Sequence, residues 1–370
     1  MRLPVNKSRM KYIDEYRDKD LILKMAGLIK RSARRNYTFM EVCGGHTAAI
    51  HRFGIPSLLP ENVRLISGPG CPVCVTATDY IDKAIVLAET EGSIIATFGD
   101  LMRVPGSEST LEKKRAEGAD IRVIFSGLDA LGIAEASPDR RVIFPGIGFE
   151  TTAPGTAITL MQAKEKKLRN FFLLSAHKIM PPAIRAVIKD GMKIDGFICP
   201  GHVASITGSD AFDFIPQEHK KACVVTGFEP LDIMQALLML INQINNEAPK
   251  IEIQYTRAVT PGGNGIAQDI LGKVFVYCDA EWRGFGIIPS SGLKPGPEFE
   301  EFDAEKVFSP AVRQTSRETL CICGEILRGV KTPSDCPVFA TACTPLAPEG
   351  ACMVSNEGAC NTFYKYRPHG

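Results

Sequence analysis

The residues of this chain best suited to metal or redox chemistry are its twelve cysteines. Cys71 and Cys74 form a CxxC pair, and Cys43 precedes them in the N-terminal half. Six more lie within the last fifty residues, at Cys321, Cys323, Cys336, Cys343, Cys352 and Cys360. Disulfide frameworks suit small secreted domains, whereas a 370-residue chain can bury a large core without them. The cysteines therefore favour metal, cluster or redox chemistry.

Cys43 begins the run Cys43-Gly-Gly-His46, directly after a predicted strand. A thiol at a helix N-terminus has a lowered pKa, which makes it a better nucleophile and a better ligand for soft metals. The alternative is a small buried residue at a strand end. For Cys71 and Cys74 the alternative is half of a zinc site, but the chain has no second CxxC pair. We therefore interpret Cys71 and Cys74 as a reversible dithiol.

Acidic and histidine side chains follow several of the other predicted strands. Asp100, Glu150 and Glu229 are candidate acid/base groups or partners of metal ligands, with helix capping as the competing explanation. His46 is a candidate cleft residue, and His177 and His202 either line the cleft or are loop histidines satisfied by hydrogen bonds. Cys199, Cys223 and Cys278 lie in or beside apolar runs, so we expect them in the core.

The six C-terminal cysteines match neither the CxxCxxC run of ferredoxins nor the paired CxxC units of zinc ribbons. They can be divided into four cluster ligands and one dithiol, although their spacing does not say which four. A loop-rich segment with little apolar content is stabilised by an inorganic group, and an iron–sulfur cluster or zinc suits thiolate ligands.

The elements that must position these residues alternate between short apolar runs and amphipathic stretches. The predicted strands are 38–42, 63–67, 94–98, 122–125, 141–144, 170–175, 196–199 and 222–226. The predicted helices include 78–91, 109–117, 155–168, 182–189 and 230–246. This alternation is typical of parallel α/β sheets, and loops after parallel strands emerge on one edge. We therefore expect the candidate residues to gather in one cleft.

The predicted fold is α/β, with two doubly wound parallel-sheet halves facing a central cleft and a Cys-rich, loop-rich iron–sulfur module at the C-terminus. We expect an N-terminal helical segment packed on the core (1–36), α/β domains at 37–145 and 146–250, and a cluster domain at 251–370. Apolar residues at helical spacing between Leu21 and Ile29 are the basis for the first segment.

Bulk composition excludes several classes of partner. The chain has 43 Lys and Arg against 42 Asp and Glu, a net charge of +1, so no global field attracts nucleic acid. No apolar run approaches the roughly 20 residues that span a bilayer, and the basic start lacks the apolar core of a signal peptide. We expect a cytoplasmic protein that is a monomer when isolated and binds neither nucleic acid nor membrane.

Taken in order, the motifs resemble those of the HypD family of hydrogenase maturation proteins from about Glu41 to Tyr366. The matching segments are CGGH, GPGCPVC, FGDxMRVPG, GFETTAP, SAHKxxPPA, CPGHV, GFEPLDI and GACMVSxEGAC. In one place the chain departs from the family, because Ala48 stands where the family often has a second histidine after CGGHT. His46 is then the local histidine candidate.

The resemblance implies a maturation factor that assembles the Fe(CN)2CO centre of [NiFe] hydrogenases with a HypC-type chaperone and a HypE-type cyanide donor protein. It implies that Cys43 holds the transient iron and that Cys71 and Cys74 are the cleft dithiol. It further implies a [4Fe–4S] cluster on Cys321, Cys336, Cys343 and Cys360, with Cys323 and Cys352 as a neighbouring redox pair. Such a protein is a redox-active scaffold more than a turnover enzyme.

Two other classes of protein remain open at this point. A stand-alone thiol–disulfide oxidoreductase of the ferredoxin:thioredoxin reductase kind would also use a cluster beside a dithiol. A structural zinc protein would use the cysteines only to hold its loops.

Overall fold

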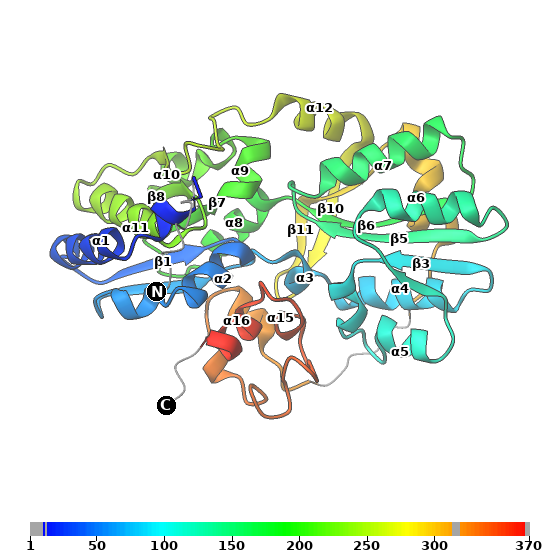
Figure 1. Cartoon of the computed structure of the whole chain (residues 1–370), viewed down its shortest axis with the longest axis horizontal. Helices are drawn as coiled ribbons and strands as arrows, with labels where there is room; N and C mark the ends of the chain where they lie inside the picture. Colours follow the sequence, from blue (N-terminus) through cyan, green and yellow to red (C-terminus); the bar gives the residue numbers. More distant parts are fainter. Residues whose placement is uncertain (1–9, 12, 313–318, 367–370) are drawn as a thin grey trace, which may run out of the picture.

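The computed structural model describes residues 10–11, 13–312 and 319–366. Two β-sheets lie side by side along the long axis of the molecule, and the Cys-rich C-terminal segment lies beneath the junction between them (Figure 1).

The first sheet has the strand order β2-β1-β7-β8-β9, and all of its strands run parallel. Its strands are β1 (Tyr37–Glu41), β2 (Val63–Ser67), β7 (Gly196–Pro200), β8 (Ala222–Thr226) and β9 (Ile251–Ile253). β7 and β8 are buried along their whole length, as expected for central strands of a parallel sheet.

The second sheet has the strand order β10-β11-β6-β5-β3-β4. Its parallel part consists of β3 (Ser93–Thr97), β4 (Ile121–Val123), β5 (Arg141–Gly148) and β6 (Phe171–Lys178). An antiparallel hairpin of β10 (Phe275–Trp282) and β11 (Gly286–Pro295) extends it beyond β6. The parallel α/β character predicted from the sequence is thus confirmed, while the second sheet is mixed.

All eight predicted strands are present, with ends shifted by at most a few residues. The strands that sequence reasoning missed are β9, β10 and β11. β10 is an edge strand whose inner residues are exposed or half-buried, so it lacks the apolar run by which the buried strands were recognised.

The chain crosses between the two sheets more often than the single predicted boundary near residues 144–154 allows. β1 and β2 belong to the first sheet, residues 93–178 supply the second, and the chain then returns to the first for β7 to β9. The predicted halves 37–145 and 146–250 each contain strands of both sheets, and the predicted segment 251–370 supplies strands to both. Strand order reflects pairing in space, which chain order does not determine.

Helices cover both sheets. They are α2 (Gly44–Arg52), α4 (Thr78–Glu89), α5 (Leu111–Ala116), α6 (Gly127–Ala136), α7 (Ala153–Glu165), α8 (Met180–Lys189), α9 (Gly201–Thr207), α10 (Phe214–His219), α11 (Pro230–Asn245), α12 (Gly265–Val274) and α13 (Ala304–Phe308). The five predicted helices lie close to α4, α5, α7, α8 and α11 among them.

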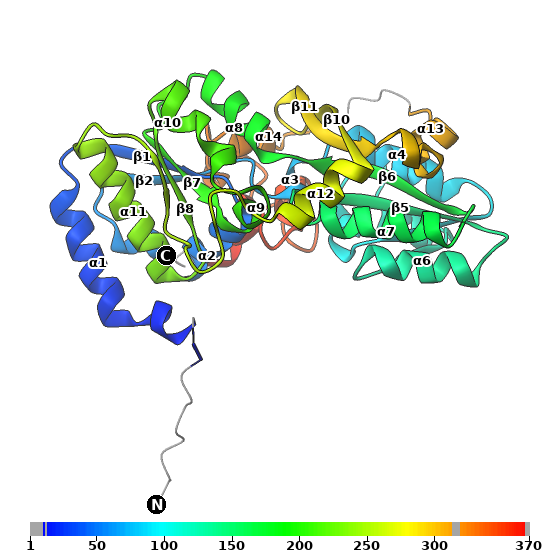
Figure 2. The same ribbon diagram turned by 90° about the horizontal axis from the view of Figure 1, so that it is seen from above.

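The N-terminal helix α1 (Lys19–Ser32) packs on α11 at the outer side of the first sheet (Figure 2). Asp18 caps it by accepting hydrogen bonds from the backbone N–H groups of Asp20 and Leu21. Ile29 is fully buried in the same cluster of apolar side chains as α11, so this part of the predicted segment 1–36 does pack on the core. Residues 1–9 and 12 of that segment lie outside the described residues.

The C-terminal segment contains short helices joined by loops, namely α14 (Cys323–Leu327), α15 (Ala351–Val354) and α16 (Ala359–Tyr366). α16 packs against α2, and α15 packs against α3 (Pro72–Val75), the short helix that carries Cys74. Within residues 10–11, 13–312 and 319–366, no helix is both long and apolar enough to cross a bilayer.

Candidate functional site

Loops from both sheets and from the C-terminal segment meet around a cavity of about 460 Å³. The cavity is lined by Cys43 after β1, Gly70 after β2, Thr151 after β5, and His202 after β7. Glu357, from the loop between α15 and α16, contributes the C-terminal part of the wall. The structure confirms that several loops from the carboxyl ends of the strands form one cleft, as the α/β pattern predicted.

Cys43 is the N-cap residue of α2, with extended backbone geometry. The next residue, Gly44, donates a backbone hydrogen bond of 2.8 Å to the carbonyl of Gly70. A Cβ atom on Gly70 would overlap the backbone of Cys43, so only glycine allows the two loops to approach this closely. The loop of the CxxC pair is thereby held directly against the half-buried Cys43.

The thiol of Cys43 does not have the lowered pKa that its helix position predicts. The backbone N–H groups of Gly45 and His46 do lower the pKa, but burial and the nearby carboxyls of Glu357 and Glu41 raise it to about 12. Cys43 is therefore a neutral thiol at pH 7 in the metal-free protein. A thiol of this kind becomes a thiolate when a metal ion displaces its proton.

Two carboxyl groups flank Cys43, and neither was singled out from the sequence. Glu41 is buried at the end of β1, where it accepts hydrogen bonds from the Cys43 backbone N–H at 3.0 Å and from the Thr47 hydroxyl. Burial raises the pKa of Glu41 to about 8. Glu357 packs on Gly44, and burial raises its pKa too. The glutamate of the C-terminal EGAC motif was the available signal for Glu357.

His46 and His202 share one aromatic partner. Both rings stack on Phe228, with centroids 4.4 Å away for His46 and 3.8 Å for His202. His202 faces the cavity. His46 is fully buried behind it, with Nε2 bonded to the carbonyl of Gly227 at 3.0 Å, and burial lowers its pKa to about 4. His46 is thus a neutral residue that does not line the cavity.

Glu150 is buried beside the cavity, although it does not line it. Its Oε1 accepts a hydrogen bond of 2.8 Å from the backbone N–H of Met180, and burial raises its pKa to about 7. It faces a second, adjoining cavity of about 430 Å³. His177 is also buried, with Nε2 3.0 Å from the Thr156 hydroxyl, and burial lowers its pKa to about 3.

Asp100 and Glu229 lie away from the cavity lining. Glu229 forms an ion pair with Arg17, whose terminal nitrogen donates to Oε1 at 2.8 Å, and it caps α11. The capping explanation therefore describes Glu229 well. Asp100 is exposed in a short 3-10 helix (Gly99–Arg103). Burial is the main cause that raises the pKa of Glu357, and the charge of Asp100 is the second.

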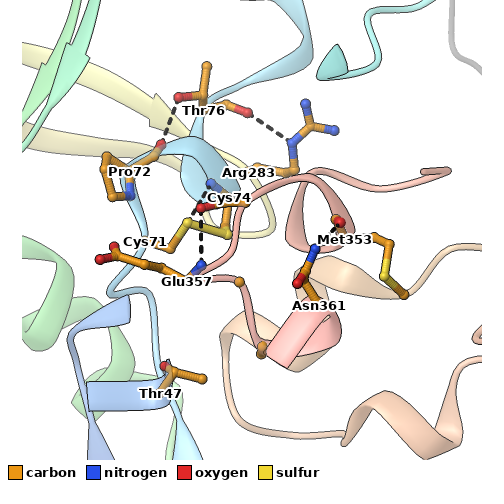
Figure 3. Close-up of a disulfide and its surroundings, with 12 residues drawn as sticks. Thr47, Cys71, Pro72, Cys74, Thr76, Arg283, Met353, Glu357 and Asn361 are labelled. Atoms are coloured by element: carbon orange, nitrogen blue, oxygen red, sulfur yellow. Dashed lines mark hydrogen bonds between the residues drawn. A yellow bond between two sulfur atoms is a disulfide. The ribbon is translucent and has the colours of Figure 1, made fainter. Parts of the chain in front are cut away.

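Cys71 and Cys74 form a disulfide, with Cα atoms 5.2 Å apart (Figure 3). Both residues are buried, and Cys71 is the N-cap of α3. Figure 3 shows Glu357 on one side of the disulfide and Arg283 on another. The pair can therefore exist in the oxidised form that the dithiol interpretation requires.

The six C-terminal cysteines lie near one another. The hydrogen bond with Cys321 is the largest influence on Cys323 and lowers its pKa, but the hydrogen bond with Cys352 and burial raise it to about 12. Burial raises the pKa of Cys360, and the charges of four neighbouring thiols raise it further, namely those of Cys321, Cys323, Cys343 and Cys336. Among the described residues, however, no three His, Cys, Asp or Glu side chains are arranged as a ready metal site.

Of the three cysteines expected in the core, two are buried there and one is not. Cys199 and Cys223 are fully buried on adjacent strands with their sulfur atoms 3.4 Å apart. Cys278 is half-buried on β10, because that strand lies at the edge of its sheet. The core assignment of Cys278 was therefore wrong.

Comparison with known proteins extends over almost the whole chain. The family model described as "HypD: Hydrogenase formation hypA family" matches residues 20–367. The hydrogenase maturation factor HypD of Rhizobium leguminosarum bv. viciae is 49% identical over 368 residues, covering 96% of each chain. HypD2 of Bradyrhizobium diazoefficiens is 47% identical, covering 97% of this chain and 98% of its own. HypD of Escherichia coli is 44% identical, covering 97% and 98% respectively. The chain belongs to the HypD family, whose named members are hydrogenase maturation factors.

Proposed function

We propose that this protein is the scaffold on which the Fe(CN)2CO unit of [NiFe] hydrogenases is assembled, with Cys43 as the residue that holds the iron. The observation that carries the proposal is the position of Cys43 in the wall of the cavity, beside the loop that contains the Cys71–Cys74 disulfide. A soft thiolate binds iron firmly while leaving other coordination positions open for cyanide and carbon monoxide. The half-buried position of Cys43 keeps the bound iron within reach of a partner protein.

The chemistry of cyanide delivery explains why a dithiol lies beside the iron position. A HypE-type partner would present cyanide as a thiocyanate on one of its cysteines. Releasing cyanide from that sulfur consumes two electrons, which the thiols of Cys71 and Cys74 supply as they form their disulfide. The partner cysteine leaves as a thiol, the cyanide binds the iron, and one proton is released.

The C-terminal thiols are suited to regenerating the Cys71–Cys74 dithiol. Cys323 and Cys352 are hydrogen-bonded to each other, and α15, which carries Cys352, packs against α3. We propose that this pair reduces the Cys71–Cys74 disulfide by thiol–disulfide exchange, in which one dithiol is oxidised as the other is formed.

The remaining four C-terminal cysteines fit a [4Fe–4S] cluster by their chemistry and by their mutual proximity. Burial raises the pKa of Cys343, and the charges of Cys321 and Cys336 raise it further. Burial also raises the pKa of Cys360, and the charges of Cys321, Cys343 and Cys336 add to that effect. Cys321, Cys336, Cys343 and Cys360 would hold the cluster, which when bound supplies electrons to the neighbouring pair. A Cβ atom on Gly350 would lie 2.5 Å from the sulfur of Cys321, so a side chain at position 350 would collide with this proposed ligand.

A stand-alone thiol–disulfide oxidoreductase is the competing function, and the burial of the disulfide argues against it. Cys71 is 3% exposed and Cys74 is fully buried, so a substrate must project its reacting sulfur into the protein to reach either, which suits one dedicated partner more than a range of disulfide substrates. General disulfide reductases expose the attacking thiol.

Infrared spectroscopy of the protein purified anaerobically with its small HypC-type chaperone tests the proposal. We expect cyanide and carbon monoxide bands from the unaltered complex. Cys71→Ala should retain the visible absorbance of the cluster but fail to accumulate cyanide bands, because the electrons for cyanide release are missing. Cys278→Ala, which removes a half-buried thiol on β10, is the matched control and should retain the bands. Unchanged cyanide bands in Cys71→Ala would contradict the proposed role of the dithiol.

A further inference from the structure

The turn between β10 and β11 reaches across the molecule to the disulfide. Trp282, the last residue of β10, forms an isolated antiparallel bridge with Thr76, two residues after Cys74. The next residue, Arg283, donates its backbone N–H to the carbonyl of Val75 at 2.9 Å. The hairpin tip is thus joined to the segment that follows the disulfide by hydrogen bonds that any residue at position 283 except proline could make.

The side chain of Arg283 adds a further contact that only a long cationic residue can provide. Its Nε donates to the carbonyl of Thr76 at 2.8 Å (Figure 3). One terminal nitrogen of the guanidinium is buried and has no hydrogen-bond partner among the described residues. No carboxylate of the described chain forms an ion pair with it in the structure. A buried cationic donor without a partner is costly, so it marks a place where negative charge is expected at some stage.

On its other side the same turn packs against the C-terminal segment. A Cβ atom on Gly284 would lie 2.5 Å from the Cα atom of Gly324, the residue after Cys323, so the two backbones touch. The positive charge of Arg283 also acts on Cys352. The hydrogen bond with Cys323 is the largest influence on that thiol and lowers its pKa, burial raises it, and Arg283 lowers it by a smaller amount. Arg283 thus contacts the segment that follows Cys74, and its charge reaches Cys352 of the second sulfur pair.

We propose that Arg283 is a positioning residue for the reduction of the Cys71–Cys74 disulfide by the C-terminal thiols. It holds the segment after Cys74 against the C-terminal segment, and it stabilises the negative charge that forms on sulfur when the disulfide is reduced. In that step a thiolate of a dithiol attacks one sulfur of the disulfide, the S–S bond breaks, and the other sulfur leaves as a thiolate. The second thiol of the attacking pair then completes its own disulfide, so two electrons have moved. This inference rests on the proposed function for the use of the step, although the step itself can be measured separately.

The test is the redox equilibrium of Cys71–Cys74 in the full chain with its metal content intact. The protein is equilibrated anaerobically at pH 8 with mixtures of reduced and oxidised dithiothreitol, trapped with N-ethylmaleimide, and analysed by peptide mass spectrometry. We expect Arg283→Gln to shift the equilibrium constant about tenfold toward the disulfide, or about 30 mV for a two-electron couple. Arg283→Lys, which retains the charge, should remain within about threefold of the unaltered protein.

A matched control is Arg103→Gln, because Arg103 also donates to a carbonyl of the C-terminal segment, that of Pro345 at 2.8 Å. It should leave the equilibrium of Cys71–Cys74 unchanged. The inference is overturned if Arg283→Gln has no effect, or if Arg283→Lys and Arg283→Gln shift the equilibrium equally, because the charge would then be irrelevant. If Arg283→Gln shifts the equilibrium and cyanide bands nevertheless accumulate normally, the role of Arg283 stands and the proposed use of the disulfide fails.

Discussion

The thiol of Cys43 receives opposing influences from its own helix and from distant parts of the chain. Its position as N-cap of α2 lowers the pKa through the backbone N–H groups of Gly45 and His46. Burial and the carboxyls of Glu357 and Glu41 outweigh that effect. At the residue scale, then, the local motif identifies the right atom, and its charge is decided by groups that the motif does not contain.

A carboxylate substitution tests this balance in the iron-free protein. Glu357→Gln removes a negative charge beside Cys43, which lowers the pKa of the thiol and increases its thiolate fraction at pH 8. We expect alkylation of Cys43 by iodoacetamide, followed by peptide mass spectrometry, to accelerate roughly threefold to tenfold, corresponding to about half to one pKa unit. In the unaltered protein the rate should still rise with pH up to pH 10, because the pKa is about 12.

The control for this experiment is Glu298→Gln, which removes an exposed carboxylate paired with Lys164 beside the second sheet. Its alkylation rate should equal that of the unaltered protein. Equal rates for Glu357→Gln as well would show that Glu357 does not act on Cys43.

At the scale of elements, the site depends on loops from two neighbouring parallel strands that touch through glycine. Gly70 follows β2 and meets the backbone of Cys43, which follows β1. The register of β1 on β2 places both strand ends at the same level, with Glu41 opposite Ser67. The two chemically different loops therefore begin side by side, and a side chain at position 70 would separate them.

Substituting this glycine should distort the site and lower stability together. A Cβ atom in Gly70→Ala would overlap the backbone of Cys43, so we expect a loss of about 2–3 kcal/mol in the free energy of unfolding. The denaturant midpoint followed by circular dichroism measures it. Gly155→Ala is the matched control, because nothing lies within 4 Å of its Cβ and alanine favours a helix by about 1 kcal/mol. Equal midpoints for Gly70→Ala and the unaltered protein would show that the two loops can separate without cost.

For the whole molecule, the C-terminal segment closes the cavity that the two sheets leave between their loops. It lies beneath the junction of the sheets, contributes Glu357 to the cavity wall, and packs α15 and α16 on α3 and α2 (Figure 1). Its own helices are short, with α15 spanning only Ala351–Val354. A segment built this way obtains much of its order from contacts with the sheets and from any metal that its thiols hold.

Loss of the proposed cluster should therefore act locally before it acts globally. In Cys360→Ala we expect backbone amides of residues 319–366 to exchange with deuterium about tenfold faster or more, while β5 and β7 keep their protection. Hydrogen exchange with mass spectrometry measures this. The comparison is Cys199→Ala, which removes a buried thiol of the first sheet. Unchanged exchange in residues 319–366 of Cys360→Ala would show that metal binding does not order this segment.

The elements that were predictable from the sequence are those in which local pattern and tertiary environment agree. β7 and β8 are apolar runs because both of their faces are buried, and the strand-end loops were recognisable because Cys43, Cys71 and His202 interrupt ordinary turn chemistry. The β10–β11 hairpin was missed because an edge strand with an exposed face has no such run. Glu357 and Arg283 were missed because their importance comes from neighbours more than two hundred residues away.

The sequence by itself determined the α/β class, the order of the buried strands and helices, and the cysteines around which the site is built. These follow from hydrophobic periodicity and from the chemistry of sulfur, which are properties of short segments. Only the tertiary structure decided how the chain passes between the two sheets and that the pKa of Cys43 is raised. It also decided that His46 and Glu229 do not line the cavity, and that Arg283 contacts the segment after Cys74. Strand pairing, burial and through-space charge depend on which distant segments meet, and no local pattern contains that information.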